Sequence, residues 1–174
     1  MYENTSNNKH HNYKNNHQFI KSCIVVLSDH NMAVQHKIGR SGEYLAASYL
    51  ARIFDEVLST SECSRYDFLC TSDQANIKVQ VKTTNSTFDH HGSKWVRWDI
   101  KKRITNKDKH RVYSAEEVDV FAFVCLLNDT VVFKPNRRLG KTFQKKLEYI
   151  DTVNSMQSLE LALAAVGTNA KPLL

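Results

Sequence analysis

The stretch at residues 65–84, RYDFLCTSDQANIKVQVKTT, contains the pattern that decides the fold. Its second half alternates apolar and polar residues, as a half-buried β-strand does. The apolar side consists of Ile77, Val79 and Val81, and the polar side of Lys78, Gln80 and Lys82. The first half is an apolar run at residues 66–70 that contains Asp67, and a short polar link joins the two halves. We therefore expect an antiparallel hairpin in which Asp67 and Gln80 are neighbours.

The elements predicted around this hairpin indicate an α/β domain. Apolar residues at helical spacing predict helices. Buried or alternating runs predict strands, and Ser114 with Glu117 predicts one capped helical turn. The predicted helices cover residues 37–54 and 155–166, and the predicted strands cover 56–60, 66–70, 77–84, 118–127 and 130–135, with a strand-like run WVRWDI at 95–100 inside a long polar region. This order predicts a mixed central β-sheet flanked by helices.

Composition divides the chain into a tail and one domain. Residues 1–17 are rich in Asn, His and Lys and predict a flexible polar tail. Residues 18–174 are predicted to form a single domain, with the run CIVVL docking on it as a strand and a basic insertion at about residues 85–112.

The overall charge and the cysteines limit the partners and the location. The 174 residues carry a formal net charge of +6, which favours a polyanion, either nucleic acid or an anionic membrane surface. The four cysteines form no CxxC pair, so structural zinc is not expected. Cys70 and Cys125 fall in apolar runs and are expected in the core. Free cysteines, short apolar runs and a polar N-terminus predict an intracellular protein without a membrane segment or a small-molecule cofactor.

A second acidic residue falls on the predicted N-terminal helix. Glu43 lies on or beside a stripe that contains Gly42 and Ala46, small residues that let a helix approach a sheet closely. A carboxylate there needs a partner, and the hairpin offers Asp67, Gln80 and Lys82 as a cluster. A hard divalent cation such as Mg²⁺ suits this set of groups. An amphipathic strand with a solvated face and a salt-bridged Glu43 are the alternatives.

Three segments together resemble the PD-(D/E)XK nuclease superfamily: GRSGEYLAASYL at 39–50, RYDFLC at 65–70 and IKVQVKTT at 77–84. The likeness is greatest to its small members, which include Holliday-junction resolvases, Mrr-like restriction nucleases and homing endonucleases of group I introns or phage genomes. The resemblance implies a restriction-endonuclease-like core and hydrolysis of phosphodiester bonds with Mg²⁺, for which Mn²⁺ can substitute.

The resemblance also implies roles for five residues. Asp67 corresponds to the metal-binding Asp, Lys82 to the motif Lys and Glu43 to the helical Glu found in many members. Gln80 stands in place of the second acid, and the backbone carbonyl of Val81 corresponds to a further metal ligand. The chain departs from the pattern in two ways. Tyr66 stands where the family has Pro, and Gln80 removes one negative charge from the site.

Basic residues follow the hairpin and suggest a DNA-binding surface. Residues 85–112 carry eight Lys and Arg against three Asp, or 8 − 3 = +5, together with two Trp. Basic residues beside aromatics suit phosphate contacts and packing on sugars or bases, although a solvated loop is the alternative. The predicted contacts are Lys94, Arg97, Lys101, Lys102, Arg103, Lys107, Lys109 and Arg111, with Arg137 and Arg138 as a second group.

The sequence thus predicts a metal-dependent endonuclease that acts on double-stranded DNA. A site-specific homing-type enzyme is the first hypothesis, because the chain is small and its motifs resemble that group. Cutting both strands requires two active sites, which predicts a homo-oligomer, a dimer or a tetramer, in the cytoplasm of a bacterial or phage-infected cell. A Holliday-junction resolvase-like nuclease and a catalytically inactive DNA-binding module are the alternatives.

Overall fold

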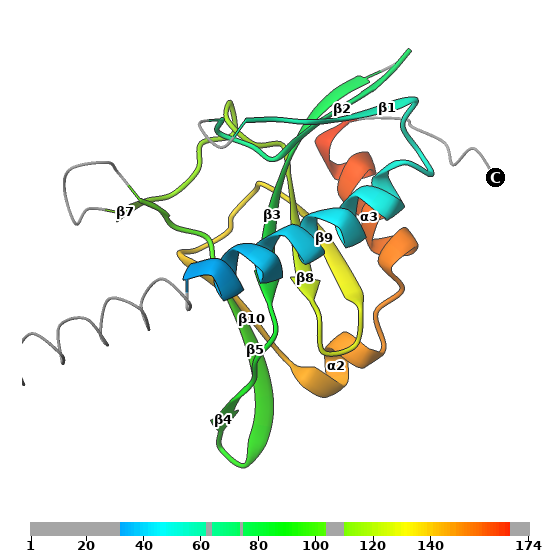
Figure 1. Ribbon diagram of the computed structural model, residues 1–174. Helices are drawn as coiled ribbons and strands as arrows, with labels where there is room; N and C mark the ends of the chain where they lie inside the picture. Colours follow the sequence, from blue (N-terminus) through cyan, green and yellow to red (C-terminus); the bar gives the residue numbers. More distant parts are fainter. Residues whose placement is uncertain (1–31, 62–63, 74, 104–109, 168–174) are drawn as a thin grey trace, which may run out of the picture. The chain divides into compact units, whose positions relative to one another are not determined.

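The structure is a computed structural model that describes residues 32–61, 64–73, 75–103 and 110–167 (Figure 1). The chain divides into two compact units, Met1–Lys37 and Ile38–Leu174. All the elements described below belong to the second unit. The predicted tail at 1–17 and the predicted docking strand CIVVL lie outside the described residues.

The N-terminal helix (residues 38–50 of this unit) presents a stripe of small and apolar residues to the sheet. Ala46 and Leu50 on this stripe are fully buried. The helix ends at residue 50, earlier than the predicted end at 54, because the amides of Ile53 and Phe54 both bond to the carbonyl of Leu50. Shared bonds of this kind tighten a last turn and stop the helix. Both residues remain buried, which explains why the apolar pattern continued past the helix.

A five-stranded mixed sheet forms the centre of the domain, with strand order β1-β2-β3-β8-β9. The strands are β1 (Glu56–Ser59), β2 (Phe68–Ser72), β3 (Ala75–Thr84), β8 (Val120–Cys125) and β9 (Thr130–Pro135). The pairs β1–β2, β2–β3 and β8–β9 are antiparallel, and β3–β8 is parallel. The fold is the predicted α/β class, with the hairpin of residues 65–84 in the middle of the sheet.

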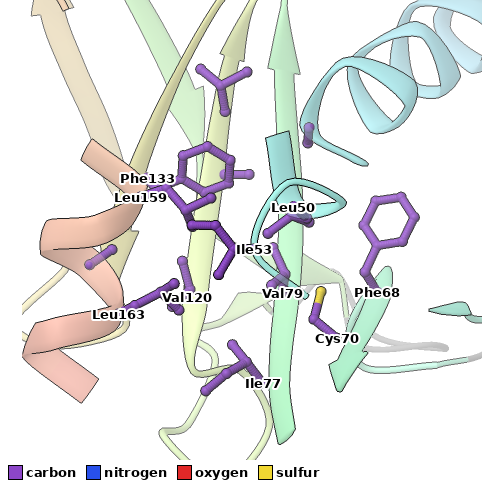
Figure 2. Close-up of a cluster of buried hydrophobic side chains, with 14 of the residues drawn as sticks. Leu50, Ile53, Phe68, Cys70, Ile77, Val79, Val120, Phe133, Leu159 and Leu163 are labelled. Atoms are coloured by element: carbon purple, nitrogen blue, oxygen red, sulfur yellow. The ribbon is translucent and has the colours of Figure 1, made fainter. Parts of the chain in front are cut away.

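One face of this sheet is covered by the N-terminal helix and by α3 (Ser155–Val166). Figure 2 shows Leu50 of the N-terminal helix and Leu159 of α3 in one apolar cluster with Val79 of β3. The predicted and observed bounds of α3 agree. Asn154 caps its N-terminus by accepting a bond from the Gln157 amide, and its C-terminus closes on a glycine with positive φ.

The other face of the sheet is covered by a second, three-stranded sheet of order β10-β5-β4. Its strands are β4 (Phe88–His90), β5 (Ser93–Asp99) and β10 (Thr142–Lys146), and α2 (Leu147–Asp151) follows β10. Val96 and Trp98 of β5 are buried, and the Trp98 indole nitrogen donates to the Val124 carbonyl at 2.8 Å. The predicted basic insertion therefore contains part of the core as well as charged residues. The insertion also contains a short antiparallel pair of strands, β6 (Lys102–Arg103) and β7 (His110–Arg111).

The free edge of the central sheet at β9 is protected by α3. The amides of Val131 and Phe133 donate to the hydroxyls of Ser155 and Ser158, at 3.1 and 3.0 Å. Unpaired edge amides invite pairing with another chain, and these hydroxyls satisfy two of them. Cys70 and Cys125 are buried and unbridged, as predicted. Within the described residues, no helix is long and apolar enough to cross a membrane.

Candidate active site

Asp67 and Gln80 lie side by side, as the hairpin predicted. Phe68 pairs with Val79, so the preceding Asp67 lies opposite Gln80. Asp67 precedes β2 but remains bonded to β3, since its amide donates to the Val79 carbonyl at 2.9 Å. The Gln80 side-chain amide donates to Asp67 Oδ2. Gln80 is only 8% exposed, so this contact lies inside the protein.

The Asp67 carboxylate is held by the backbone as well as by Gln80. The Val81 amide donates to Asp67 Oδ2 at 2.6 Å. Burial raises the pKa of Asp67, and the Val81 hydrogen bond, the charge of Lys82 and the Gln80 hydrogen bond oppose that rise. A desolvated carboxylate that is held in one orientation gains strongly from a cation beside it.

The oxygen atoms near Gln80 meet the requirements of a hard cation. The Gln80 amide nitrogen donates to Asp67 Oδ2 and also to the Val81 carbonyl, at 3.2 Å for the latter. Two of the predicted metal ligands therefore converge on one hydrogen-bond donor, which occupies the kind of position that a small cation takes. In this orientation the Gln80 nitrogen, rather than its carbonyl oxygen, faces the two oxygens.

The set of acidic groups at this point is small. Among the described residues, no group of three or more His, Cys, Asp or Glu side chains is placed to hold a metal ion. The candidate ligands are one carboxylate, one backbone carbonyl and one side-chain amide, with Glu43 as a second carboxylate. Mg²⁺ accepts such a set because it retains several waters.

Glu43 lies on the N-terminal helix, which packs on the opposite face of β3 from Gln80 and Lys82. Its neighbour Gly42 approaches β3 so closely that a Cβ there would lie 2.0 Å from Thr83 Oγ1. Glu43, the next residue in the helix, is partly buried. The predicted role of small residues in this approach is confirmed at Gly42. The metal-binding role of Glu43 stays a prediction.

Lys82 is partly buried and contacts Tyr113. Its ammonium donates to the Tyr113 hydroxyl at 3.2 Å and lies 5.2 Å from the centre of the Tyr113 ring. Tyr113 is 8% exposed. Burial raises the pKa of Tyr113 to about 12, helped by the negative charges of Asp67 and Glu117, so its phenol stays neutral. Tyr113 was not among the residues predicted for the site, because nothing in the sequence connects it with Lys82.

Glu117 fixes the loop that carries Tyr113. Its buried carboxylate accepts hydrogen bonds from both terminal guanidinium nitrogens of Arg111, one of them at 2.5 Å. The same carboxylate lies 3.4 Å from the Arg65 guanidinium. It also accepts from the Ser114 amide at 3.1 Å, which is half of the predicted capping box. The Arg111 hydrogen bonds lower the pKa of Glu117 from 4.5 to about 2, against the opposing effect of burial.

The predicted DNA-binding residues fall into four groups. Lys94, Arg97, Lys101, Arg137 and Arg138 are exposed. Lys94 pairs with Asp89 at 3.0 Å, and Arg97 lies over the Phe88 ring at 5.5 Å. Lys102 and Arg103 form β6, whereas Lys107 and Lys109 lie outside the described residues. Arg111 is bound to Glu117, which makes it the least available of the predicted contacts.

The fold and this site define a nuclease of the PD-(D/E)XK class. Residues 34–158 match the family model described as PD-(D/E)XK endonuclease, and the chain belongs to that family. Among solved structures, the chain is similar to a bacterial homing endonuclease, I-Ssp6803I, with a TM-score of 0.55 and 16% sequence identity. That match covers 75% of this chain and 93% of the other, and it supports the restriction-endonuclease-like fold. No curated protein matches the sequence.

Proposed function

We propose that this chain is a divalent-metal-dependent endonuclease that cuts double-stranded DNA at a specific site, as a homing-type enzyme. Family membership supports phosphodiester hydrolysis. The similarity to the solved structure of a bacterial homing endonuclease supports the choice of substrate. The observation that carries the proposal is the convergence of Asp67 Oδ2 and the Val81 carbonyl on one point beside Lys82.

In this proposal Asp67, the Val81 carbonyl and the Gln80 carbonyl hold Mg²⁺, with Mn²⁺ as a substitute. Glu43 joins them from the helix side, because the β2–β3 pairing ends at Phe68–Val79 and leaves the β2 side of β3 open beyond Val79. The bound ion supplies polarisation of the scissile phosphodiester and a lower pKa for the attacking water. The Val81 amide fixes the orientation of the Asp67 carboxylate. Lys82 stabilises the negative charge that develops on the phosphate, or orients the nucleophile.

The DNA-binding surface is proposed to include the outer side of β4 and β5 and the loop after β9. The exposed cations Lys94, Arg97 and Lys101 belong to the first region, and Arg137 and Arg138 to the second. Contacts to phosphates would supply sequence-independent affinity that weakens as salt concentration rises. A homo-oligomer, a dimer or a tetramer, would provide the second active site that a double-strand break requires.

Cleavage of DNA with and without metal tests this proposal. A pool of long duplex DNA and a synthetic four-way junction are incubated with Mg²⁺ or with a chelator. The proteins compared are the wild type, Lys82→Ala and Lys78→Ala. Lys78 is the matched control, because it lies on the same face of β3 two residues before Gln80. We expect discrete duplex fragments from wild type and Lys78→Ala with Mg²⁺ alone. Lys82→Ala should cleave at least about 100-fold more slowly.

Other outcomes would change the assignment. Full cleavage by both Lys82→Ala and Asp67→Asn would show that the site is wrong. Cleavage of the junction alone would favour a Holliday-junction resolvase-like enzyme. The replacement of the second acid by Gln80 favours one further candidate, a DNA-binding module without catalysis. Chelator-insensitive binding of DNA, without cleavage of either substrate, would support that module.

A further inference from the structure

Tyr113 contacts the Lys82 ammonium with its aromatic hydroxyl. The two residues are 31 positions apart in the chain, and the Lys82 ammonium donates to the Tyr113 hydroxyl at 3.2 Å. The ammonium also lies 5.2 Å from the centre of the ring. A lysine has a flexible stem and a single charged group, so its direction depends on the groups that meet that charge. Here one tyrosine meets it with both its hydroxyl and its ring.

Tyr113 is held by a contact to its ring and by hydrogen bonds of residues on both sides of it in the chain. Its ring packs edge-on against Phe121 of β8, with the ring centres 5.5 Å apart and an interplanar angle of 80°. Two residues before it, Arg111 is bound to Glu117, and directly after it the Ser114 amide donates to the same carboxylate. Glu117 is 5% exposed, so the carboxylate that receives these bonds is buried, whereas the Arg111 side chain stays partly exposed. The loop on both sides of Tyr113 is therefore fixed to one buried group.

We infer that Tyr113 is a positioning residue that holds the Lys82 ammonium in place for the reaction, with Glu117 and Arg111 fixing the loop that carries it. This inference rests on the proposed nuclease function. Tyr113 accepts a hydrogen bond from Lys82, so the proton of its own hydroxyl points away from the ammonium. The phenol is neutral at working pH, and it orients Lys82 without adding charge to the site. Lys82 remains the residue proposed to act on the phosphate.

The variant Tyr113→Phe tests the inference because it removes the hydroxyl and keeps the ring against Phe121. Tyr149→Phe is the matched control, on α2 and exposed at its surface. The first measurement needs no DNA. It follows the side-chain ammonium signal of Lys82 in a ¹⁵N-edited spectrum, assigned by its loss in Lys82→Ala. We expect a sharp signal in wild type and Tyr149→Phe, and a signal broadened by exchange with water in Tyr113→Phe.

The second measurement is single-turnover cleavage with Mg²⁺ in wild-type and Lys82→Ala backgrounds. Tyr113→Phe should lower the rate of cleavage by about tenfold in the wild-type background and leave DNA affinity unchanged. In the Lys82→Ala background the same change should have no further effect, since its action passes through Lys82.

The two measurements separate the inference from the proposed function. An ammonium signal that stays sharp in Tyr113→Phe would overturn the positioning role, and so would an equal loss of rate in both backgrounds. No cleavage by wild type, with the expected broadening in Tyr113→Phe, would support the positioning of Lys82 and count against the nuclease function.

Discussion

The two faces of β3 differ in what they bury, although they share one backbone. On the face toward the helices, Val79 and Val81 join a cluster that is wholly apolar. On the other face, Gln80 and Lys82 lie among aromatic side chains of the second cluster, next to Asp67 and Tyr113. The first face contributes stability through removal of apolar surface from water. The second contains polar groups whose burial costs free energy unless each one finds a partner.

This difference shows that the polar face of β3, which contacts Asp67, is the face whose burial costs free energy. The raised pKa of Asp67 means that its charged form is destabilised by burial. The apolar face and the ion pair at Glu117 keep the chain folded around that group. Substitutions on the apolar face, beside the polar face and at the edge of the sheet should therefore separate stability from chemistry.

The largest effect on stability is expected from the apolar face. Leu50→Ala removes a fully buried side chain from the contact between the N-terminal helix and the sheet. We expect the free energy of unfolding to fall by about 3 kcal/mol, measured by urea denaturation. Leu161→Ala, at an exposed position of α3, is the control and should change little. Cleavage per folded molecule should stay near that of wild type. A specific loss of cleavage in fully folded Leu50→Ala would contradict the separation of the two faces.

An intermediate effect on stability is expected from the ion pair of Glu117 with Arg111, beside the site. Glu117→Gln removes the charge that binds Arg111 and Arg65 and should lower the free energy of unfolding by about 2 kcal/mol at pH 7. The pKa of Glu117 is lowered from 4.5 to about 2, so its contribution is complete above pH 4.5 and is lost as pH falls toward 2.

The pH dependence provides a second check on Glu117. The wild type should lose stability between pH 4.5 and about 2 more steeply than Glu117→Gln, in denaturation measured at a series of pH values. Glu116→Gln, on the exposed neighbouring residue, should follow the wild-type curve. Parallel curves for wild type and Glu117→Gln would show that the ion pair contributes nothing measurable.

The smallest effect is expected at the edge of the sheet. Ser158→Ala removes the hydroxyl that accepts a hydrogen bond from the Phe133 amide. It should lower the free energy of unfolding by about 1 kcal/mol. Ser48→Ala, on the exposed side of the N-terminal helix, is the control, and its stability should be equal to or slightly above that of wild type. If Ser158→Ala matched the control, a water molecule would be an adequate substitute for the hydroxyl at this edge.

Local pattern predicted much of the fold, because helices and strands show their buried faces as periodic apolar residues. The predicted 155–166 helix, the β8–β9 hairpin and the neighbouring positions of Asp67 and Gln80 are all confirmed. The strand predicted at 95–100 is confirmed by β5, but the sheet to which it belongs was not predicted, since its buried residues Val96 and Trp98 lie in a segment dominated by charge. There the apolar alternation is short, and only its packing against β8 shows that it belongs to the core.

The sequence by itself determined the class of fold and the residues at the centre of the site, because Asp67, Gln80 and Lys82 lie within one hairpin whose register follows from alternation. Only the tertiary structure decided which groups surround them. Tyr113 reaches Lys82, and Glu117 reaches Arg111 and Arg65, through contacts between separate segments. Such contacts depend on where the backbone brings distant residues together, and local periodicity contains no information about that distance.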